Sequence, residues 1–326
     1  MNEMAKCGEH VNMSSPQLSI VIVSWNVAEL IQGCLDSIAK YSSDIPLEVI
    51  VVDNASKDDT VRKLRENYPW VQVIANEANI GFARANNQAL KYVKGEFVLL
   101  LNPDTAVVER ALNTMREFLL SHPEVGMVGP RIILPNGLVQ DMSARLLPTL
   151  GWSLLCDSLN LNKLPVVGHL ITRRYVSPYN YNLTQPVEAI SGAAMMLRRT
   201  VIERVGLFGE SFLHCGEDVD LCFRIQKSGW NIIYLCDAAV VHYDGRSRAQ
   251  APVRVEINTT LSIQQYFVRC FGGIQGACYR IIVQVIKVPI TVLVGIVKTL
   301  TGRENLEALK RRCAIAKGIW RWRPVE

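Results

Sequence analysis

The sequence predicts an α/β fold with a mainly parallel central sheet, and three observations support this class. Short apolar runs alternate with segments of helical spacing through the first 133 residues. The run at 97–101 is continuously apolar, as expected of a strand buried on both faces of a sheet. Polar and acidic residues follow these runs directly, at the edge where open α/β sheets bind ligands.

The individual elements follow from these patterns in chain order. Apolar runs predict strands at 18–25, 47–53, 71–75, 97–101 and 125–133. Apolar residues at helical spacing predict intervening helices at 29–41, 57–67, 83–93 and 107–121. Strands that alternate with helices in this way form βαβ units, so we expect parallel neighbours. The later pattern predicts an apolar stretch at 187–197, a helix at 218–228 and a strand at 231–241.

The segment 134–186 shows no clear order of elements. It is rich in Pro, Asn, Tyr and Gly, and it is long for a simple connection. We therefore expect part of it to cover a site. The domain organisation predicted for the chain is a loose polar tail at 1–16, an α/β domain at 17–250 and a helical region at 251–326.

Cysteine usage and the amino-terminal residues indicate a cytosolic protein. The nine Cys include no Cys-x-x-Cys pair and are odd in number, which favours reduced thiols over a disulfide framework or a zinc site. The first 16 residues lack the apolar core of a signal peptide.

The carboxyl-terminal region combines basic charge with apolar residues. Residues 240–326 carry fourteen Lys or Arg against five Asp or Glu, which predicts an anionic surface as partner. The apolar stretch 281–297 favours a membrane over nucleic acid, and Lys287 within it disfavours a spanning helix. We expect an interfacial or re-entrant helix whose basic residues face lipid head groups: Arg269, Arg280, Lys287, Lys298 and Arg303. The alternative is a packed helical hairpin of a soluble protein.

A candidate metal site follows from two residues that end apolar runs. Asp104 comes just after the strand at 97–101, and His242 just after the strand at 231–241. A divalent cation that neutralises a diphosphate takes carboxylate oxygens, and a neutral imidazole can serve as a second ligand. The alternatives are that Asp104 or Thr105 caps the next helix, and that His242 is an ordinary polar residue at a strand end.

Candidate donor-binding residues lie at the ends of other strands. Asp53 could accept a hydrogen bond from a base N–H, although Asp53 or Ser56 could instead cap the following helix. The turn from Asn79 to Gly81 allows close backbone approach to phosphate at a helix start. The dinucleotide Gly-x-Gly-x-x-Gly and P-loop motifs are absent from the sequence, which disfavours both of those folds.

An acidic cluster supplies a candidate general base. Glu217, Asp218 and Asp220 are three carboxylates in four residues, and burial together would raise the pKa of at least one of them. A carboxylate is suited to deprotonate an acceptor hydroxyl. The alternative is an acidic first helical turn with Asp220 paired to Arg224. We adopt that alternative for Asp220 but not for Asp218.

Taken together, these motifs resemble the family 2 glycosyltransferases, which are inverting enzymes with the GT-A fold. The resemblance extends over 18–247, and its seven motifs occur in family order. They are Val-Ser-Trp-Asn (23–26), Val-Asp-Asn-Ala-Ser (52–56), Asn-x-Gly-Phe-Ala (79–83), Leu-Asn-Pro-Asp (101–104), Ser-Gly-Ala-Ala-Met (191–195), Gly-Glu-Asp-Val-Asp-Leu-Cys-x-Arg (216–224) and His-x-x-Gly-x-Ser (242–247). Val-Gly-Pro-Arg (128–131) and Asn-Gly-Leu-Val-Gln (136–140) are most similar to the rhamnosyltransferase-type members.

The resemblance implies a role for each matched residue. Asp53 would hold the donor base, Asp104 and His242 a Mg²⁺ or Mn²⁺ ion, and Asp218 would be the general base with Glu217 at the acceptor edge. The donor side would also include Ser24, Asn26, Asn79, Gly81, Asn102 and Gly192, with Gly192 beside the sugar. The chain has Asn102 where the family commonly has the first Asp of Asp-x-Asp, and Arg84 lies upstream of its usual place.

The expected activity is inverting transfer of a sugar, with rhamnose from dTDP-rhamnose as the best candidate. The acceptor would be a glycan or a lipid-linked sugar in cell-surface polysaccharide synthesis, at the cytoplasmic face of the inner membrane. Nucleic acid is not expected as a partner. Two alternatives stand beside this hypothesis. One is a sugar nucleotidyltransferase, although no Gly-rich loop follows the first strand. The other is an inactive membrane scaffold of the same fold.

Overall fold

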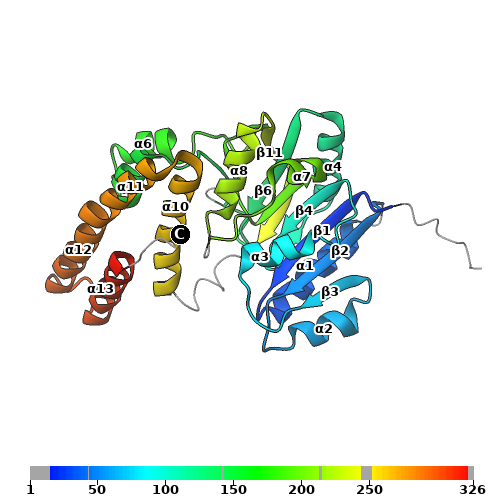
Figure 1. Cartoon of the computed structure of the whole chain (residues 1–326), viewed down its shortest axis with the longest axis horizontal. Helices are drawn as coiled ribbons and strands as arrows, with labels where there is room; N and C mark the ends of the chain where they lie inside the picture. Colours follow the sequence, from blue (N-terminus) through cyan, green and yellow to red (C-terminus); the bar gives the residue numbers. More distant parts are fainter. Residues whose placement is uncertain (1–14, 43, 141–142, 213–214, 244–251, 322–326) are drawn as a thin grey trace, which may run out of the picture.

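The computed structural model describes residues 15–42, 44–140, 143–212, 215–243 and 252–321. Figure 1 shows an α/β domain on the right and a helical carboxyl-terminal region on the left. The expected tail at 1–16 lies almost wholly outside the described residues.

The first half of the sheet is fully parallel, as predicted. Its strands lie in the order β3-β2-β1-β4, and each apolar run in the sequence forms one of them. The central pair is fully buried because both faces of the sheet are covered by helices. The bounds are β1 (Leu18–Ser24), β2 (Leu47–Asp53), β3 (Val71–Ala75) and β4 (Phe97–Leu101).

The second half of the sheet is mixed. β10 (Ala194–Arg198) runs antiparallel between β4 and β6 (Val125–Ile133), and β11 (Asn231–His242) pairs parallel with β6. Two short strands pair antiparallel with β11: β5 (Thr105–Val107) and β8 (Gln185–Pro186). A separate ladder joins β7 (Ala144–Arg145) to β9 (Ala189–Ile190). The carboxyl ends of β1, β2, β4, β6 and β11 therefore share one sheet edge with the start of β10.

Helices cover the sheet on both faces because successive strand residues point to opposite sides. Ile20 and Ile22 pack with α1 (Ala28–Tyr41), α2 (Thr60–Asn67) and α4 (Ala111–Ser121) in one core cluster. Val21 and Val23 pack with α3 (Phe82–Ala89), α7 (Arg199–Val205) and α8 (Glu217–Lys227) in the other. The result is the three-layer arrangement expected of alternating β and α elements.

Two helices begin later in the structure than their sequence patterns predict. α2 begins at Thr60 rather than 57, because Asp58 Oδ1 accepts the backbone N–H of Thr60 at 3.1 Å and holds a turn there. The helix expected from 107 begins at Ala111, because Thr105–Val107 forms strand β5 against β11.

The unassigned segment 134–186 contains several short helices. They are α5 (Leu150–Trp152), a π-helical turn η1 (Ser153–Ser158), a 3-10 turn η2 (Leu161–Lys163) and α6 (Gly168–Tyr175). The two ends of the helical segment 147–175 meet beside β7. The Leu146 backbone N–H donates to the Val176 carbonyl at 2.8 Å, and Ser177 Oγ donates to the Ala144 carbonyl at 3.0 Å.

The carboxyl-terminal helices pack against the α/β domain. Phe212 and Val219 of that domain form one buried cluster with Tyr266, Phe267 and Tyr279. The region consists of α10 (Pro252–Phe271), α11 (Gly273–Ile281), a π-helical turn η3 (Ile282–Lys287), α12 (Val288–Leu300) and α13 (Leu306–Arg321). α11, η3 and α12 form one continuous helix, Gly273–Leu300, which by length and composition could cross a membrane.

Two basic residues expected to face lipid head groups form ion pairs within the protein instead. Lys287 Nζ donates to both Asp157 oxygens, at 2.8 and 3.0 Å, and to Thr260 Oγ1 at 3.2 Å. The Lys287 side chain is 14% exposed, so its charge needs a partner within the protein. Arg269 is 38% exposed, but its Nε lies 3.3 Å from a carboxylate oxygen of buried Asp220, which needs a charge partner.

Candidate active site

Asp53 is buried at the end of β2 and receives three hydrogen bonds. Ser24 Oγ donates to Oδ2 at 2.9 Å, the Ser56 backbone N–H to Oδ1 at 2.8 Å, and Ser56 Oγ to Oδ2 at 2.5 Å. A carboxylate offers about four acceptor positions, so one remains for a ligand N–H. The capping alternative for Asp53 and Ser56 is wrong, since α2 begins at Thr60 without a side-chain cap.

Asn26 joins the loops after β1 and β2. Its backbone N–H donates to Ser56 Oγ at 2.8 Å, and its side-chain Oδ1 accepts the Lys57 N–H at 2.8 Å. Its φ of 53° is left-handed, a conformation that Asn tolerates better than most residues. Ser24 and Asn26 therefore lie beside Asp53 and hold the loops around it.

The turn 79–81 is attached to the same edge. Asn54 Nδ2 donates to the Gly81 carbonyl at 3.3 Å, and Asn79 Oδ1 accepts the Gly81 N–H at 3.0 Å. Gly81 has φ 89° directly before α3, which favours glycine because a side chain is strained there. The structure thus places Asn79 and Gly81 beside the end of β2.

Asp104 and His242 meet, although 138 positions separate their numbers in the sequence. His242 Nε2 lies 3.3 Å from Asp104 Oδ1, and the Tyr243 N–H donates to the Asp104 carbonyl at 2.9 Å. Pairing of β5 with β11 sets Thr105 opposite His242 and so fixes the contact. Asp104 is therefore not a helix cap, and His242 is not an isolated polar residue.

The bonding of His242 fits a divalent cation. Gln140 Oε1 lies 2.9 Å from His242 Nδ1. With a hydrogen on Nδ1 donating to that oxygen, Nε2 of a neutral imidazole is the nitrogen that would bind a cation beside the Asp104 carboxylate. A cation at that position would satisfy both electron-rich groups, and Gln140 would orient the imidazole. The described residues contain no group of three or more His, Cys, Asp or Glu suited to a metal. Water and phosphate oxygens would complete the coordination, as is usual for Mg²⁺.

Asn102 contributes through its backbone. Its N–H donates to the Ala193 carbonyl at 2.9 Å, and its carbonyl accepts Thr105 Oγ1 at 2.7 Å. These bonds tie the end of β4 to the segment before β10, where Gly192 lies. Asn102 therefore helps to place Asp104 and Gly192 at one edge of the sheet.

Asp218 lies directly over Gly192 at the start of α8. Its Oδ2 forms a 2.7 Å ion pair with Arg145 Nη2, and its Oδ1 accepts the Val219 N–H at 2.9 Å. A Cβ added at Gly192 would lie 3.5 Å from Asp218 Oδ2. An added Cβ would be in ordinary van der Waals contact with Asp218, so Gly192 and the Asp218 carboxylate are direct neighbours.

Burial separates the surroundings of Glu217 from those of Asp218. Burial raises the pKa of Glu217 to about 8, with a further contribution from the charge of Asp218 and an opposing one from Arg145. Glu217 is thus largely protonated at neutral pH. Asp218 instead forms the 2.7 Å pair with Arg145, and 14% of its side chain is exposed.

Asp220 has a structural role, as expected. Its carboxylate receives Arg224 Nε at 2.8 Å, which is the predicted i, i+4 pair. Arg269 of α10 is a second partner, so Asp220 also joins α8 to the carboxyl-terminal region.

Sequence reasoning missed Arg145 and gave no role to Gln140. Both lie in 134–186, where no periodic pattern could place them. The one available signal was that Arg145 is the only charged residue between Asp141 and Asp157. Arg246 and Ser247 of the motif at 242–247 lie outside the described residues.

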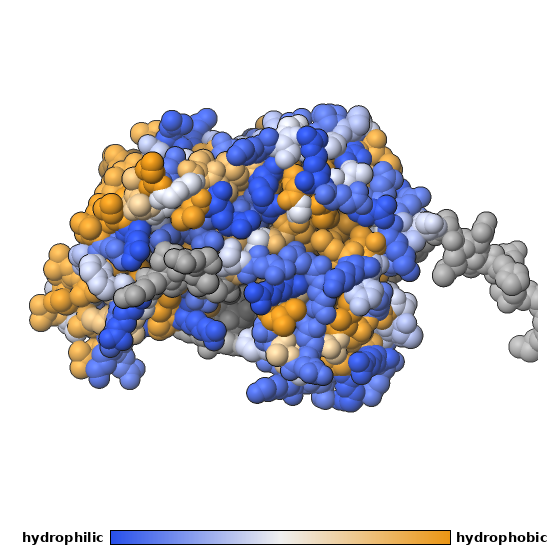
Figure 2. All heavy atoms as spheres, viewed as in Figure 1, coloured by the Kyte–Doolittle hydropathy of each residue, from blue (hydrophilic) through white to orange (hydrophobic). Residues whose placement is uncertain are grey.

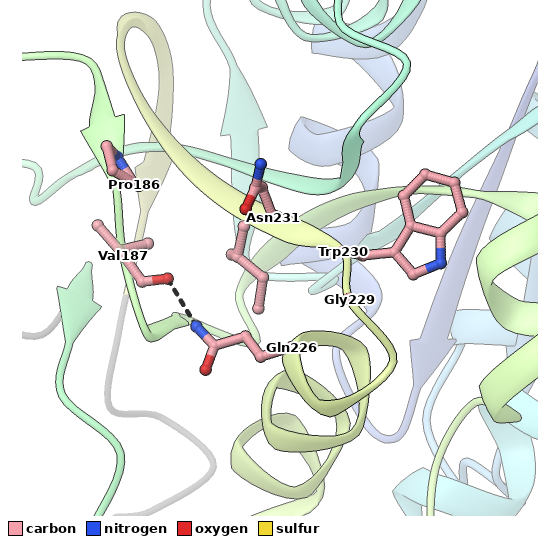
Figure 3. A pocket seen from close by; sticks show the side chains of 7 residues that line it. Pro186, Val187, Gln226, Gly229, Trp230 and Asn231 are labelled. Carbon is pink, nitrogen blue, oxygen red and sulfur yellow. Dashed lines mark hydrogen bonds between the residues drawn. The ribbon is translucent and has the colours of Figure 1, made fainter.

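A cavity of about 260 Å³ lies at the opposite end of α8 (Figure 3). It adjoins the start of β11, and Gln226 Nε2 donates across it to the Val187 carbonyl at 3.0 Å, while Trp230 points away. Because Asp218 and His242 are at the other ends of these elements, the cavity is not part of the candidate site.

Comparisons with known proteins place the fold and the sequence among known proteins. A sequence model of a family described as "Glycosyltransferase like family 2" matches residues 16–254. The chain is 28% identical over 251 residues to an N-acetylglucosaminyl-diphospho-decaprenol L-rhamnosyltransferase of Mycobacterium tuberculosis, covering 72% of this chain and 78% of that protein. It is 25% identical over 252 residues to rhamnosyltransferase WbbL of Escherichia coli, covering 74% and 90%. The mannosyltransferase PcManGT from Pyrobaculum calidifontis, solved with GDP-Man and Mn²⁺, shares the fold with a TM-score of 0.55 and 18% identity, covering 94% of this chain and 88% of that one.

Proposed function

The chain belongs to the family 2 glycosyltransferases and has the GT-A fold, and from this premise we propose an inverting, metal-dependent sugar transfer from a nucleoside diphosphate donor. One observation carries the proposal: Asp53, the Asp104–His242 pair and Asp218 over Gly192 converge on one edge of the sheet. Asp53 would then bind the nucleobase, the Asp104–His242 pair the diphosphate through a metal ion, and Asp218 would take the acceptor proton.

The donor would bind from the base towards the sugar. Asp53 would accept a base N–H with its remaining acceptor position, while Ser24 and Ser56 hold the carboxylate in place. Asp104 and His242 would hold a divalent cation, which when bound neutralises charge on the diphosphate. Gly192 would lie beside the sugar, next to Asp218.

The chemical step needs one proton acceptor. The acceptor hydroxyl oxygen forms a bond to the anomeric carbon on the face opposite the diphosphate, and its proton passes to Asp218. The bond between that carbon and the diphosphate oxygen breaks, and the nucleoside diphosphate leaves with the electron pair. Arg145 positions the Asp218 carboxylate before the reaction.

We further propose rhamnose from dTDP-rhamnose as the donor sugar and a lipid-linked or glycan acceptor. Both curated relatives described above are named rhamnosyltransferases, and the name of one specifies a diphospho-decaprenol acceptor. Family membership removes the nucleotidyltransferase alternative. The joined Asp104–His242 pair and the Asp218–Arg145 pair beside Gly192 favour an active enzyme over an inactive scaffold.

The carboxyl-terminal region 251–326 is proposed to hold the enzyme on the cytoplasmic face of a membrane. The helix Gly273–Leu300 exposes apolar side chains on one side and packs against protein on the other, which suits a helix lying in the interface. A spanning orientation would carry the Lys287–Asp157 ion pair into hydrocarbon.

Mass spectrometry of the products tests the proposed reaction. The enzyme is incubated with a panel of nucleotide sugars and a lipid-linked acceptor, with Mg²⁺ or Mn²⁺ and with EDTA. We expect a single glycosylated product with inverted anomeric configuration, loss of turnover in EDTA, and recovery when the metal is returned. Full activity in EDTA would refute the metal site, and retained configuration would refute the role of Asp218.

A further inference from the structure

Two stretches of this chain contain basic residues and no Asp or Glu. They are 158–187, with Lys163, Arg173 and Arg174, and 273–303, with four Lys or Arg. The whole chain averages about one acidic residue in eleven, with 30 among 326. Both stretches therefore favour an anionic partner.

The second stretch forms a helix with one apolar face. Exposed apolar residues recur along it, from Ile274 at 83% exposure to Leu300 at 82%, with Ile281, Val285, Leu293 and Val297 between them. The π-helical turn η3 inserts an extra residue per turn, and Lys287 at its end pairs with Asp157 instead of interrupting this face. Figure 2 shows apolar side chains gathered over α11 and α12.

The first stretch exposes a second set of apolar side chains. Val166 is 87% exposed and Leu170 is 68% exposed, and Leu164 and Val167 are exposed beside them. Leu170 lies in α6, and the other three lie in the turn between η2 and α6. Arg173 and Arg174 follow in the last turn of α6. Water-exposed apolar residues bordered by basic ones are typical of a surface that binds anionic lipid.

The two apolar sets are held together by the protein. η1 contacts both η3 and α6, and Asp157 of η1 forms the ion pair with Lys287 of η3. α6 and α11 lie at the same end of the molecule in Figure 1. Their relative position is therefore set by packed elements.

We propose that residues 161–175 form a second membrane-contacting element, which binds the interface of an anionic bilayer together with the exposed face of Gly273–Leu300. The proposal deepens the membrane association proposed above and rests on it. The segment 147–175 begins and ends beside Arg145. The Arg145 guanidinium pairs with the proposed base Asp218. A bilayer bound to this element lies where a lipid-linked acceptor would approach the site.

Flotation with vesicles of phosphatidylglycerol and phosphatidylcholine tests the second element. The full-length triple variant Leu164→Ser/Val166→Ser/Leu170→Ser removes exposed apolar side chains without touching the buried core. We expect its partitioning to fall at least about tenfold, because each lost side chain would otherwise leave water on binding. Leu138→Ser is the matched control, since Leu138 is also exposed but lies outside both sets, and it should float like the wild type.

Two further measurements separate the possible outcomes. Thermal unfolding should show the triple variant as stable as the wild type. Turnover on a short, water-soluble acceptor should be the same in the triple variant and the wild type, because this reaction does not need membrane binding. Absence of turnover in both proteins would contradict the proposed catalytic function without bearing on the membrane contact. If the triple variant floated with vesicles as the wild type does, or if the wild type did not float at all, the proposal that residues 161–175 contact the membrane would be wrong.

Discussion

Asp218 and Glu217 are adjacent in sequence, but their surroundings give them different chemistry. Asp218 is paired with Arg145 and lies against Gly192, whereas burial keeps Glu217 protonated at neutral pH. The family resemblance named Asp218 as the base and Glu217 at the acceptor edge, but the sequence did not show the Arg145 pair or the burial of Glu217, which are the physical grounds for separating the two roles.

Replacement of Asp218 by Asn tests its role as the base. Because general bases contribute about 10²–10⁴-fold, we expect Asp218→Asn to lower kcat by that factor. Nucleotide binding, measured by calorimetry, should remain near that of the wild type. Asp237→Asn, at an exposed position on β11, is the control and should keep its activity. Near-normal turnover of Asp218→Asn would show that another group takes the proton.

Glu217 should make stability depend on pH in a defined direction. Its pKa is about 8 in the folded protein against an ordinary 4.5, so the folded state binds more protons than the unfolded state between these values. Stability therefore falls as pH rises through this window, and the full penalty is present above pH 8. We expect Glu217→Gln to have little effect on Tm near pH 4.5 and to raise Tm clearly at pH 8.5. The corresponding gain in unfolding free energy at pH 8.5 is on the order of a few kcal/mol.

The same melting series on Glu77→Gln, at an exposed position, provides the comparison and should follow the wild type at every pH. If Glu217→Gln lowered Tm at high pH, the carboxyl group of Glu217 would have to be ionised and paired in the folded enzyme.

Among the elements, the ion pair between η1 and η3 offers the clearest test of helix packing. Lys287 and Asp157 are mostly enclosed, with 14% and 21% of their side chains exposed. Removing one partner leaves an enclosed charge, so we expect Lys287→Met to cost about 1–3 kcal/mol of unfolding free energy, less than for a fully buried pair. Adding Asp157→Asn should recover part of this loss in chemical denaturation.

An exposed pair makes a suitable control for that cycle. Arg62→Met removes a surface partner of Asp59 and Glu66, and its cost should be within about 1 kcal/mol. Additive effects of the two substitutions at 287 and 157 would mean that the pair does not hold η1 and η3 together.

The sequence predicted elements better than their arrangement. Apolar runs located β1, β2, β3, β4, β6 and β11, because burial on both faces leaves a local signature. The pairing of β5 with β11 has no such signature, since it depends on which distant strands become neighbours. The contact of Asp104 with His242 depends on that pairing, so each residue was identified while their proximity was not. Arg145 was not identified because its segment has no periodic pattern that would place it in an element.

At the scale of the whole molecule, the carboxyl-terminal helices contribute to the stability of the catalytic domain. α10 packs on α8, Arg269 pairs with Asp220, and Tyr266 and Phe267 are fully buried. A chain that ends at Ser262 loses these contacts and leaves Phe212 and Val219 without their buried partners. The region is thus part of the folded unit as well as the proposed membrane surface.

That truncation should unfold the protein rather than simply release it from lipid. Loss of the buried aromatic side chains lowers the free energy of unfolding by on the order of 5–10 kcal/mol. This loss is comparable with the total stability of a typical domain. We expect a broad or absent thermal transition for the shortened chain. The full-length variant Leu293→Ser/Val297→Ser alters only exposed side chains and should melt like the wild type. A sharp transition of the shortened chain near the wild-type Tm would show that the domain folds alone.

The position of β10 has a consequence for how the protein is made. β10 separates β4 from β6 in the sheet, yet it follows β4 by almost 100 residues in the chain. At about 5–20 residues per second, a ribosome needs roughly 5–20 seconds to synthesise that interval. During this time the nascent β3-β2-β1-β4 sheet has an open apolar edge at β4, which could pair with another chain. Chaperone capture of nascent chains should therefore be strongest after β4 has emerged and should decline once β10 closes that edge.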